Sequence, residues 1–194
     1  MKNIHFGIDK KLLKELGNYY HTLVYVGKEN PFVRGEMRSI FWKTTDESYF
    51  PLDKANPEIV PVTRGQCVKG NTYTYESDSF RYFLQDYWIS DDYWTGGLHE
   101  MYRVCNRHLL IIDPKSGEVA AERVFSSGEG TTPVPLCLDE TDINDCFDMQ
   151  WTGTLFKNKP PVVFYFLYDS FGCRFIIFLN PAEDDIYIRC DNRH

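Results

Sequence analysis

The sequence predicts an α+β fold: a mostly antiparallel β-sheet with a C-terminal meander of about four strands and two short helices packed on it. Aromatic residues make up 16% of the chain, and Phe, Tyr and Trp fit the pleated, half-buried surface of a sheet. Turn-forming stretches cut residues 147–190 into short β-branched and aromatic runs. Two other segments repeat apolar residues at helical spacing. With 194 residues, 43% of them hydrophobic, the chain suits a single domain over residues 1–194.

The two predicted helices each follow a residue that can cap a helix. Asp9 precedes the first, residues 10–20, and its carboxylate can accept hydrogen bonds from the free N–H groups of the first turn. The second covers residues 80–88 (FRYFLQDYW) and follows Ser77 and Asp78. Its apolar residues recur three and four positions apart, which places them on one helix face.

The first half of the chain also contains β-prone segments separated by one long irregular stretch. Strands are expected at residues 21–26, 38–43 and 71–76, where β-branched and aromatic residues dominate. Residues 44–70 hold three prolines among Asp and Asn, so we expect a surface loop or insertion with one short strand near 59–63. Loops of this length often carry function.

The second half predicts antiparallel strands in series. The clearest hairpin joins residues 109–113 to 118–125 through the turn PKSG. Four strands follow at 148–156, 162–168, 173–179 and 186–190, and their short connections imply antiparallel neighbours. Few Lys or Arg side chains accompany their aromatic residues, so we expect these rings to form core and not a platform for nucleic-acid bases.

The net charge of −7 is concentrated in the second half of the chain. Residues 1–97 hold 12 Lys and Arg against 13 Asp and Glu, whereas residues 98–194 hold 9 against 15. A nucleic-acid binder needs a basic footprint, which an acidic chain lacks, so no nucleic-acid partner is predicted. The charge fits either a solvated surface or a protein that binds a basic partner.

The sequence also favours a cytoplasmic location and no membrane association. The N-terminus lacks the apolar core of a signal peptide, and the longest apolar run is far too short to span a bilayer. The six cysteines are widely and irregularly spaced, unlike those of a small disulfide-stapled scaffold. In the cytoplasm they are expected to be reduced.

Residues 91–108 contain the densest group of reactive side chains, namely His99, Glu100, Cys105 and His108. This segment has no second Cys-x-x-Cys pair and no His-Glu-x-x-His motif, so neither a metal nor another cofactor is predicted. Cys105 beside His99 or His108 could supply a thiolate nucleophile with its base. A small enzyme with its site here is therefore one alternative.

A second candidate is the acidic lead-in to the last strand series, at residues 139–148. It fails the calcium-loop pattern, because no glycine occupies the sharp turn of an EF-hand. Its carboxylates could dock a basic protein, with nearby exposed aromatic residues as anchors. The predicted partner-binding residues are Asp139, Glu140, Asp142, Asp145, Asp148, Tyr93 and Trp94.

These observations rank three functions. The leading hypothesis is a non-catalytic acidic binding protein that neutralises or docks a basic partner, as an immunity protein or inhibitor covers the active site of a toxin nuclease. Its carboxylates would imitate phosphates and steer fast association. The alternatives are the small enzyme at 91–108 and a domain that binds a small ligand. The sequence does not specify the oligomeric state.

Overall fold

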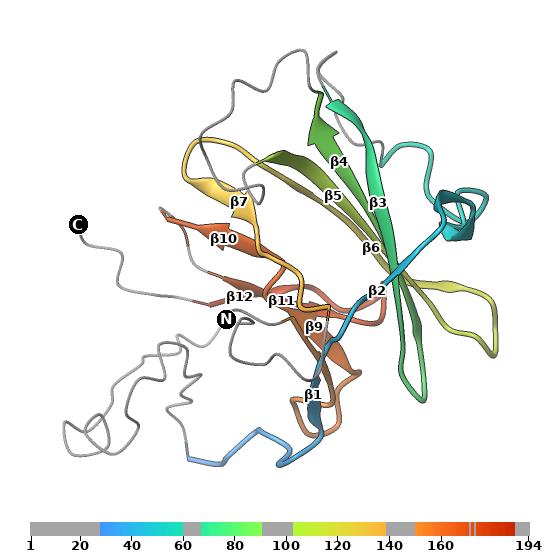
Figure 1. Ribbon diagram of the computed structural model, residues 1–194. Helices are drawn as coiled ribbons and strands as arrows, with labels where there is room; N and C mark the ends of the chain where they lie inside the picture. Colours follow the sequence, from blue (N-terminus) through green and yellow to red (C-terminus); the bar gives the residue numbers. More distant parts are fainter. Residues whose placement is uncertain are drawn as a thin grey trace.

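A computed structural model describes residues 28–59, 67–90, 103–138, 150–170, 172 and 174–188. Within these residues 49% lie in strands and 3% in helical turns, and the strands form three antiparallel sheets. The predicted α+β class is therefore wrong, and the described part of the chain is an all-β structure (Figure 1). The helix predicted at 10–20 and the strand predicted at 21–26 lie outside the described residues.

The largest sheet has five strands in the order β2-β3-β4-β5-β6, each antiparallel to its neighbours. A single turn of 3-10 helix, η1 (Glu47–Tyr49), follows its first strand. The strands are β2 (Lys43–Thr45), β3 (Cys67–Glu76), β4 (Arg81–Ile89), β5 (Val104–Ile112) and β6 (Val119–Ser126).

The second sheet contains the C-terminal meander. Its order is β1-β8-β9-β11-β12, so β8, β9, β11 and β12 are successive antiparallel neighbours, as predicted. The single strand predicted at 162–168 is wrong: residues 162–164 pair with β11, residues 167–169 pair with β7 in another sheet, and Tyr165 between them has a φ of +75°. A separate two-stranded sheet pairs β7 with β10. The strands are β1 (Met37–Ser39), β7 (Thr131–Pro133), β8 (Trp151–Gly153), β9 (Val162–Phe164), β10 (Leu167–Asp169), β11 (Phe175–Phe178) and β12 (Ile186–Tyr187).

The two five-stranded sheets share one hydrophobic core. Leu84 and Leu109 of the large sheet and Val163 and Ile177 of the second sheet belong to the same buried cluster, and each is at most 1% exposed. The arrangement is a β-sandwich, in which two sheets bury their facing side chains against each other. The C-terminal aromatic residues join this packing, as predicted: Phe166 is 2% exposed.

The second predicted helix, at residues 80–88, is instead strand β4. Its residues Tyr82 to Tyr87 are almost all buried, on both faces of the sheet, so the polar and apolar alternation of a half-buried strand is missing. Gln85 and Asp86 are buried polar residues in the middle of the run. In the sequence they separate apolar residues at a spacing that also fits the polar face of a helix. The aromatic content of the segment was the better indicator of a strand.

The predicted strand at 38–43 is divided between the two sheets. Met37–Ser39 pairs with β8 in the second sheet, and Lys43–Thr45 pairs with β3 in the large sheet. Between them Ile40 and Trp42 are fully buried, and their N–H groups donate to carbonyls outside any strand ladder. The segment therefore forms a corner of the sandwich. The strand at 71–76 and the hairpin through PKSG are confirmed within β3 and at β5–β6.

Gly153 provides a direct test of how β1 and β8 pair. Its φ is +138°, and a Cβ atom there would lie 2.1 Å from the backbone oxygen of Glu36. We predict that Gly153→Ala lowers the free energy of unfolding by about 3 kcal/mol or more, because backbone strain and a backbone clash add. Gly117→Ala is the control, since its φ is also positive but open space surrounds it; we expect a loss of about 1 kcal/mol there. If urea denaturation showed that both variants lose the same free energy of unfolding, this pairing of β1 with β8 would be contradicted.

Candidate functional site

Most of the residues that the sequence singles out lie outside the described part of the chain. Of the predicted site residues, the structure places Cys105 and His108, both on β5. The remaining predictions are neither supported nor opposed by the structure. They concern Tyr93, Trp94, His99, Glu100, Asp139, Glu140, Asp142, Asp145 and Asp148.

Cys105 forms a disulfide with Cys67, the first residue of β3. Cys137 is also disulfide-bonded, so the expectation of reduced cysteines is wrong for these three residues. The nucleophile in cysteine catalysis is the thiolate, and a sulfur in a disulfide has none. In this state Cys105 and His108 are bonded to different partners and do not form a nucleophile–base pair.

His108 instead forms a buried pair with Glu122 of β6. The two side chains are 2% and 7% exposed, and His108 Nε2 lies 2.8 Å from Glu122 Oε1. The backbone N–H of Asn56 donates to the other oxygen, Oε2, at 2.9 Å. The ring of Phe50 covers the imidazole, with 5.0 Å between centroids. The described segment 50–56, which follows β2, is thus fastened to the outer face of the large sheet.

A second buried pair lies on the inner face of the same sheet. Arg107 and Asp86 are both nearly inaccessible, and the guanidinium binds the carboxylate through two nitrogens, at 2.7 and 3.1 Å. The Arg107 Nη1 also donates to the backbone oxygen of Val134, which directly follows β7. Such a fork-to-carboxylate pair satisfies buried charges that would otherwise be very unfavourable.

Buried tyrosines contribute polar groups that stay neutral. Burial raises the pKa of Tyr82 above its ordinary value of 10.0, although a hydrogen bond to Thr152 partly opposes this. The two hydroxyl oxygens are 2.7 Å apart and join the large sheet to β8. Burial likewise raises the pKa of Tyr73. Both phenols are therefore structural hydrogen-bonding groups and not acids poised for proton transfer near neutral pH.

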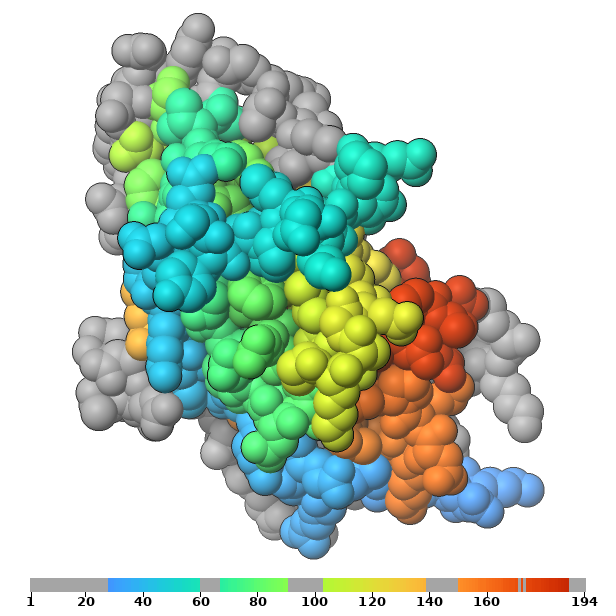
Figure 2. All heavy atoms as spheres, turned by 90° about the vertical axis from the view of Figure 1, so that its right-hand side faces the viewer, coloured from blue at the N-terminus to red at the C-terminus, as the bar shows by residue number. Residues whose placement is uncertain are grey.

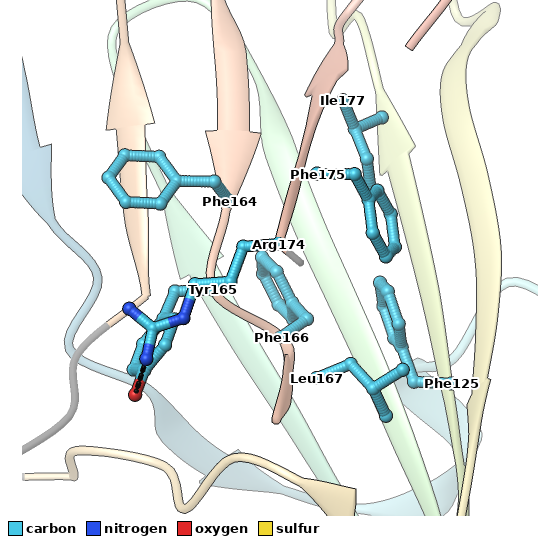
Figure 3. Close-up of a pocket in the computed structure, with 8 residues that line it drawn as sticks. All are labelled: Phe125, Phe164, Tyr165, Phe166, Leu167, Arg174, Phe175 and Ile177. Carbon is cyan, nitrogen blue, oxygen red and sulfur yellow. Dashed lines mark hydrogen bonds between the residues drawn. The ribbon is translucent and has the colours of Figure 1, made fainter. Parts of the chain in front are cut away.

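The aromatic cluster between β6 and the second sheet encloses only a very small cavity (Figure 3). Its volume is about 10 Å³, roughly the space of one water molecule. The rings of Phe125 and Phe166 stack with centroids 5.3 Å apart. At its edge the guanidinium of Arg174 lies 3.8 Å from the centre of the Tyr165 ring and donates to the Tyr165 hydroxyl. These contacts describe core packing and leave no room for a ligand.

A larger groove of about 380 Å³ lies beside strand β6. We call it the β6 groove, and it is lined by side chains from residues 54–59, 119–123 and 178–183. Figure 2 looks onto the face where these three segments meet, coloured teal, yellow and red. Among the described strands none pairs with β6 on this side, because β6 ends the large sheet. The groove therefore lies where the large sheet stops and the turn after β11 begins.

Two acidic segments contribute residues to the lining of the β6 groove. Residues 46–59 carry four carboxylates and one lysine, and residues 180–187 carry three carboxylates and no basic residue. The charged residues of the lining itself are Lys54, Glu122, Arg123 and Glu183. Arg123 binds Asp185, and Lys159 binds Glu183. The lining therefore balances positive and negative side chains, and the excess negative charge belongs to the two segments that flank the groove.

Sequence reasoning did not predict that the two acidic segments lie at one groove, or that Glu122 is buried. Glu122 falls in a strand that reads as ordinary alternation, and its burial arises from His108 on the neighbouring strand. Residues 44–70 were expected to be a surface loop of a length that often carries function, but the position of residues 54–59 beside residues 180–183 depends on the folding of the whole chain. The cluster 183–185 in the sequence was the one local signal available.

Comparisons with known proteins give no further guide: no family model, curated protein or solved structure matches this chain. Within the described residues, no group of three or more His, Cys, Asp or Glu side chains converges as metal ligands would. No described helix has the length and apolar character needed to cross a membrane.

The buried Asp86–Arg107 pair makes a prediction about stability. Arg107→Met would leave Asp86 as an unpaired buried carboxylate, so we expect a loss of about 3–5 kcal/mol in the free energy of unfolding. The double variant Asp86→Leu with Arg107→Met should recover most of this loss, because no uncompensated charge remains. A double-mutant cycle by urea denaturation measures the coupling. Simple additivity of the two single changes would contradict a structural pair.

Proposed function

We propose that this protein is a non-catalytic binding protein that docks a basic protein partner on the face containing the β6 groove. The observation that carries this proposal is the placement of charge: two segments, each with a net charge of −3, both contribute residues to the lining of one groove. The net charge of the whole chain, −7, has the same sign. Complementary charge of this kind speeds association and selects the partner.

The same face offers apolar contact area. Tyr49 and Leu52, in the acidic segment 46–59, are 60% and 56% exposed. Large exposed apolar side chains amid charged residues are typical of interface anchors, since a few buried aromatic or aliphatic groups supply most of the binding energy. Charge would thus guide the partner, and these side chains would contribute affinity once they are covered.

The class of partner follows from the chemistry. A surface rich in carboxylates can occupy a site built for phosphate groups, so an immunity-like or inhibitor-like role against a toxin nuclease fits the charge. The predicted acidic residues at 139–148, with Tyr93 and Trp94, remain part of this proposal as an extension of the interface. A small-ligand-binding function is the second candidate, because the β6 groove of about 380 Å³ is large enough for one.

The compartment is also a proposal. The cytoplasmic location expected from the sequence assumed reduced cysteines, whereas Cys67, Cys105 and Cys137 are disulfide-bonded. Disulfides persist in oxidising compartments and are rare in the cytosol. We therefore favour a protein that works where disulfides are maintained, such as a cell surface or a periplasm.

The proposal predicts that charge reversal in the two acidic segments that flank the β6 groove, here called the groove variant, abolishes capture of the partner. Asp53→Lys with Asp184→Lys adds the same charge as the control Asp78→Lys with Glu129→Lys, which lies on other turns of the chain. Immobilised wild type and control should retain the same basic protein from an extract of the source cells, identified by mass spectrometry, and the groove variant should lose it. The purified partner should bind at least about tenfold more slowly when salt is raised from low to high ionic strength.

Two results would contradict this function. One is binding of the recovered protein that is unchanged by the groove variant. The other is an association rate that does not respond to salt, because steering between opposite charges is screened by ions.

A further inference from the structure

The Cys67–Cys105 disulfide joins two strands that are not neighbours in the large sheet. Strand β4 lies between β3 and β5 and pairs with both of them (Figure 1). Each of these two ladders continues to Arg81, at the far end of β4 from the disulfide. Backbone hydrogen bonds therefore hold the three strands together whether or not the two sulfurs are bonded. The disulfide is a cross-link added at one end of an already paired sheet.

The two cysteines of this bond are more accessible than the third disulfide-bonded cysteine that the structure describes. Cys67 and Cys105 are each partly exposed, whereas Cys137 is 1% exposed. Thiol–disulfide exchange requires that a thiolate reach one sulfur of the bond, so its rate depends on access. A dissolved thiol should therefore react with the Cys67–Cys105 bond and spare that of Cys137.

The surroundings of Cys105 suit a thiol as well as a disulfide. Its Sγ lies 3.2 Å from the backbone oxygen of Tyr87, which can accept a hydrogen bond from a thiol S–H. The Asn106 Nδ2 donates to the same sulfur at 3.8 Å. Asn106 is 3% exposed, and its Oδ1 accepts a bond of 2.7 Å from Ser126 Oγ, which fixes the direction of the amide. A Cys105 sulfur released from the bond thus finds a donor and an acceptor already in place.

We propose that the Cys67–Cys105 disulfide is a reversible modification site that exchanges with low-molecular-weight thiols in the folded protein. A thiolate attacks the Cys67 sulfur and forms a mixed disulfide there. The bond between the two cysteines breaks, its electron pair leaves on Cys105 beside the Asn106 amide, and a proton from water completes the thiol. A second thiolate attacks the small-thiol sulfur of the mixed disulfide and frees Cys67. In total two small thiols are oxidised to their disulfide and the protein disulfide is reduced to two thiols.

Reduction is expected to loosen only the end of the large sheet that carries the disulfide. Register shifts interrupt both ladders close to it, between Lys69 and Thr72 and between Tyr87 and Trp88. A ladder interrupted in this way opens more readily than a continuous one. The amide of Trp88, which has registered neighbours on both β3 and β5, should therefore lose protection when the cross-link is removed.

The test treats the folded protein with an excess of reduced glutathione and alkylates free thiols at intervals. Mass spectrometry then identifies the alkylated cysteines and the mixed disulfides. We expect Cys67 and Cys105 to become alkylated at least about tenfold faster than Cys137, and glutathione to be found on Cys67 and not on Cys105. Return to a buffer of oxidised glutathione should re-form the same pair. Hydrogen exchange of the reduced protein should be at least about tenfold faster at the Trp88 amide and unchanged at Leu84.

Variants test the role assigned to Asn106. Asn106→Leu removes the amide donor at similar volume, so we expect reduction by glutathione to slow about threefold and the preference for Cys67 in the mixed disulfide to be lost. Since Asn106 is buried, Ser126→Ala serves as a second variant if the first fails to fold; it frees the Asn106 side chain and should act in the same direction. The control Ser79→Ala changes an exposed serine on the β3–β4 turn and should react as the wild type does.

Several results would overturn this inference. A disulfide that glutathione reduces only after denaturant is added would be purely structural, as would one whose reduction unfolds the protein and exposes Cys137 to alkylation at the same rate. Glutathione found on Cys105 alone, or an Asn106→Leu variant with unchanged rate and unchanged site of attachment, would overturn the direction of exchange. None of these outcomes depends on whether the protein binds a basic partner.

Discussion

Two adjacent residues of β5 impose the constraint on which the rest of the structure depends. Arg107 and His108 are both buried, and neighbouring residues of a strand point to opposite faces of the sheet. Each meets a carboxylate from a neighbouring strand, Asp86 on one face and Glu122 on the other. A sheet that buries polar groups on both faces must be covered on both faces. The second sheet covers one, and residues 46–59 cover the other.

That outer cover links the fold to the proposed function. Phe50 packs over His108, and the Asn56 N–H bonds Glu122, so the acidic segment 46–59 is held against β6. Residues from this segment and from the turn after β11 line the β6 groove. The same interaction that satisfies a buried histidine therefore also fixes one side of that groove.

The sequence predicted those parts of the fold that depend on local signals. The hairpin at PKSG was identified because Gly117 supplies a positive φ, and the meander because its connections are short. Strand β4 was not, because burial on both faces removed its alternation and left a spacing that also fits a helix. The burial of Glu122 was missed since His108, Glu122 and Asn56 are distant in sequence and meet only after β5, β6 and the segment after β2 have packed.

Hydrogen exchange of the Asn56 amide tests the central claim most directly, because this amide donates to Glu122 and holds residues 46–59 against the large sheet. The account predicts slow exchange of this amide in the wild type and exchange at least about tenfold faster in Glu122→Ala, which removes the acceptor. An Asn56 amide that exchanges equally fast in both proteins would contradict the account.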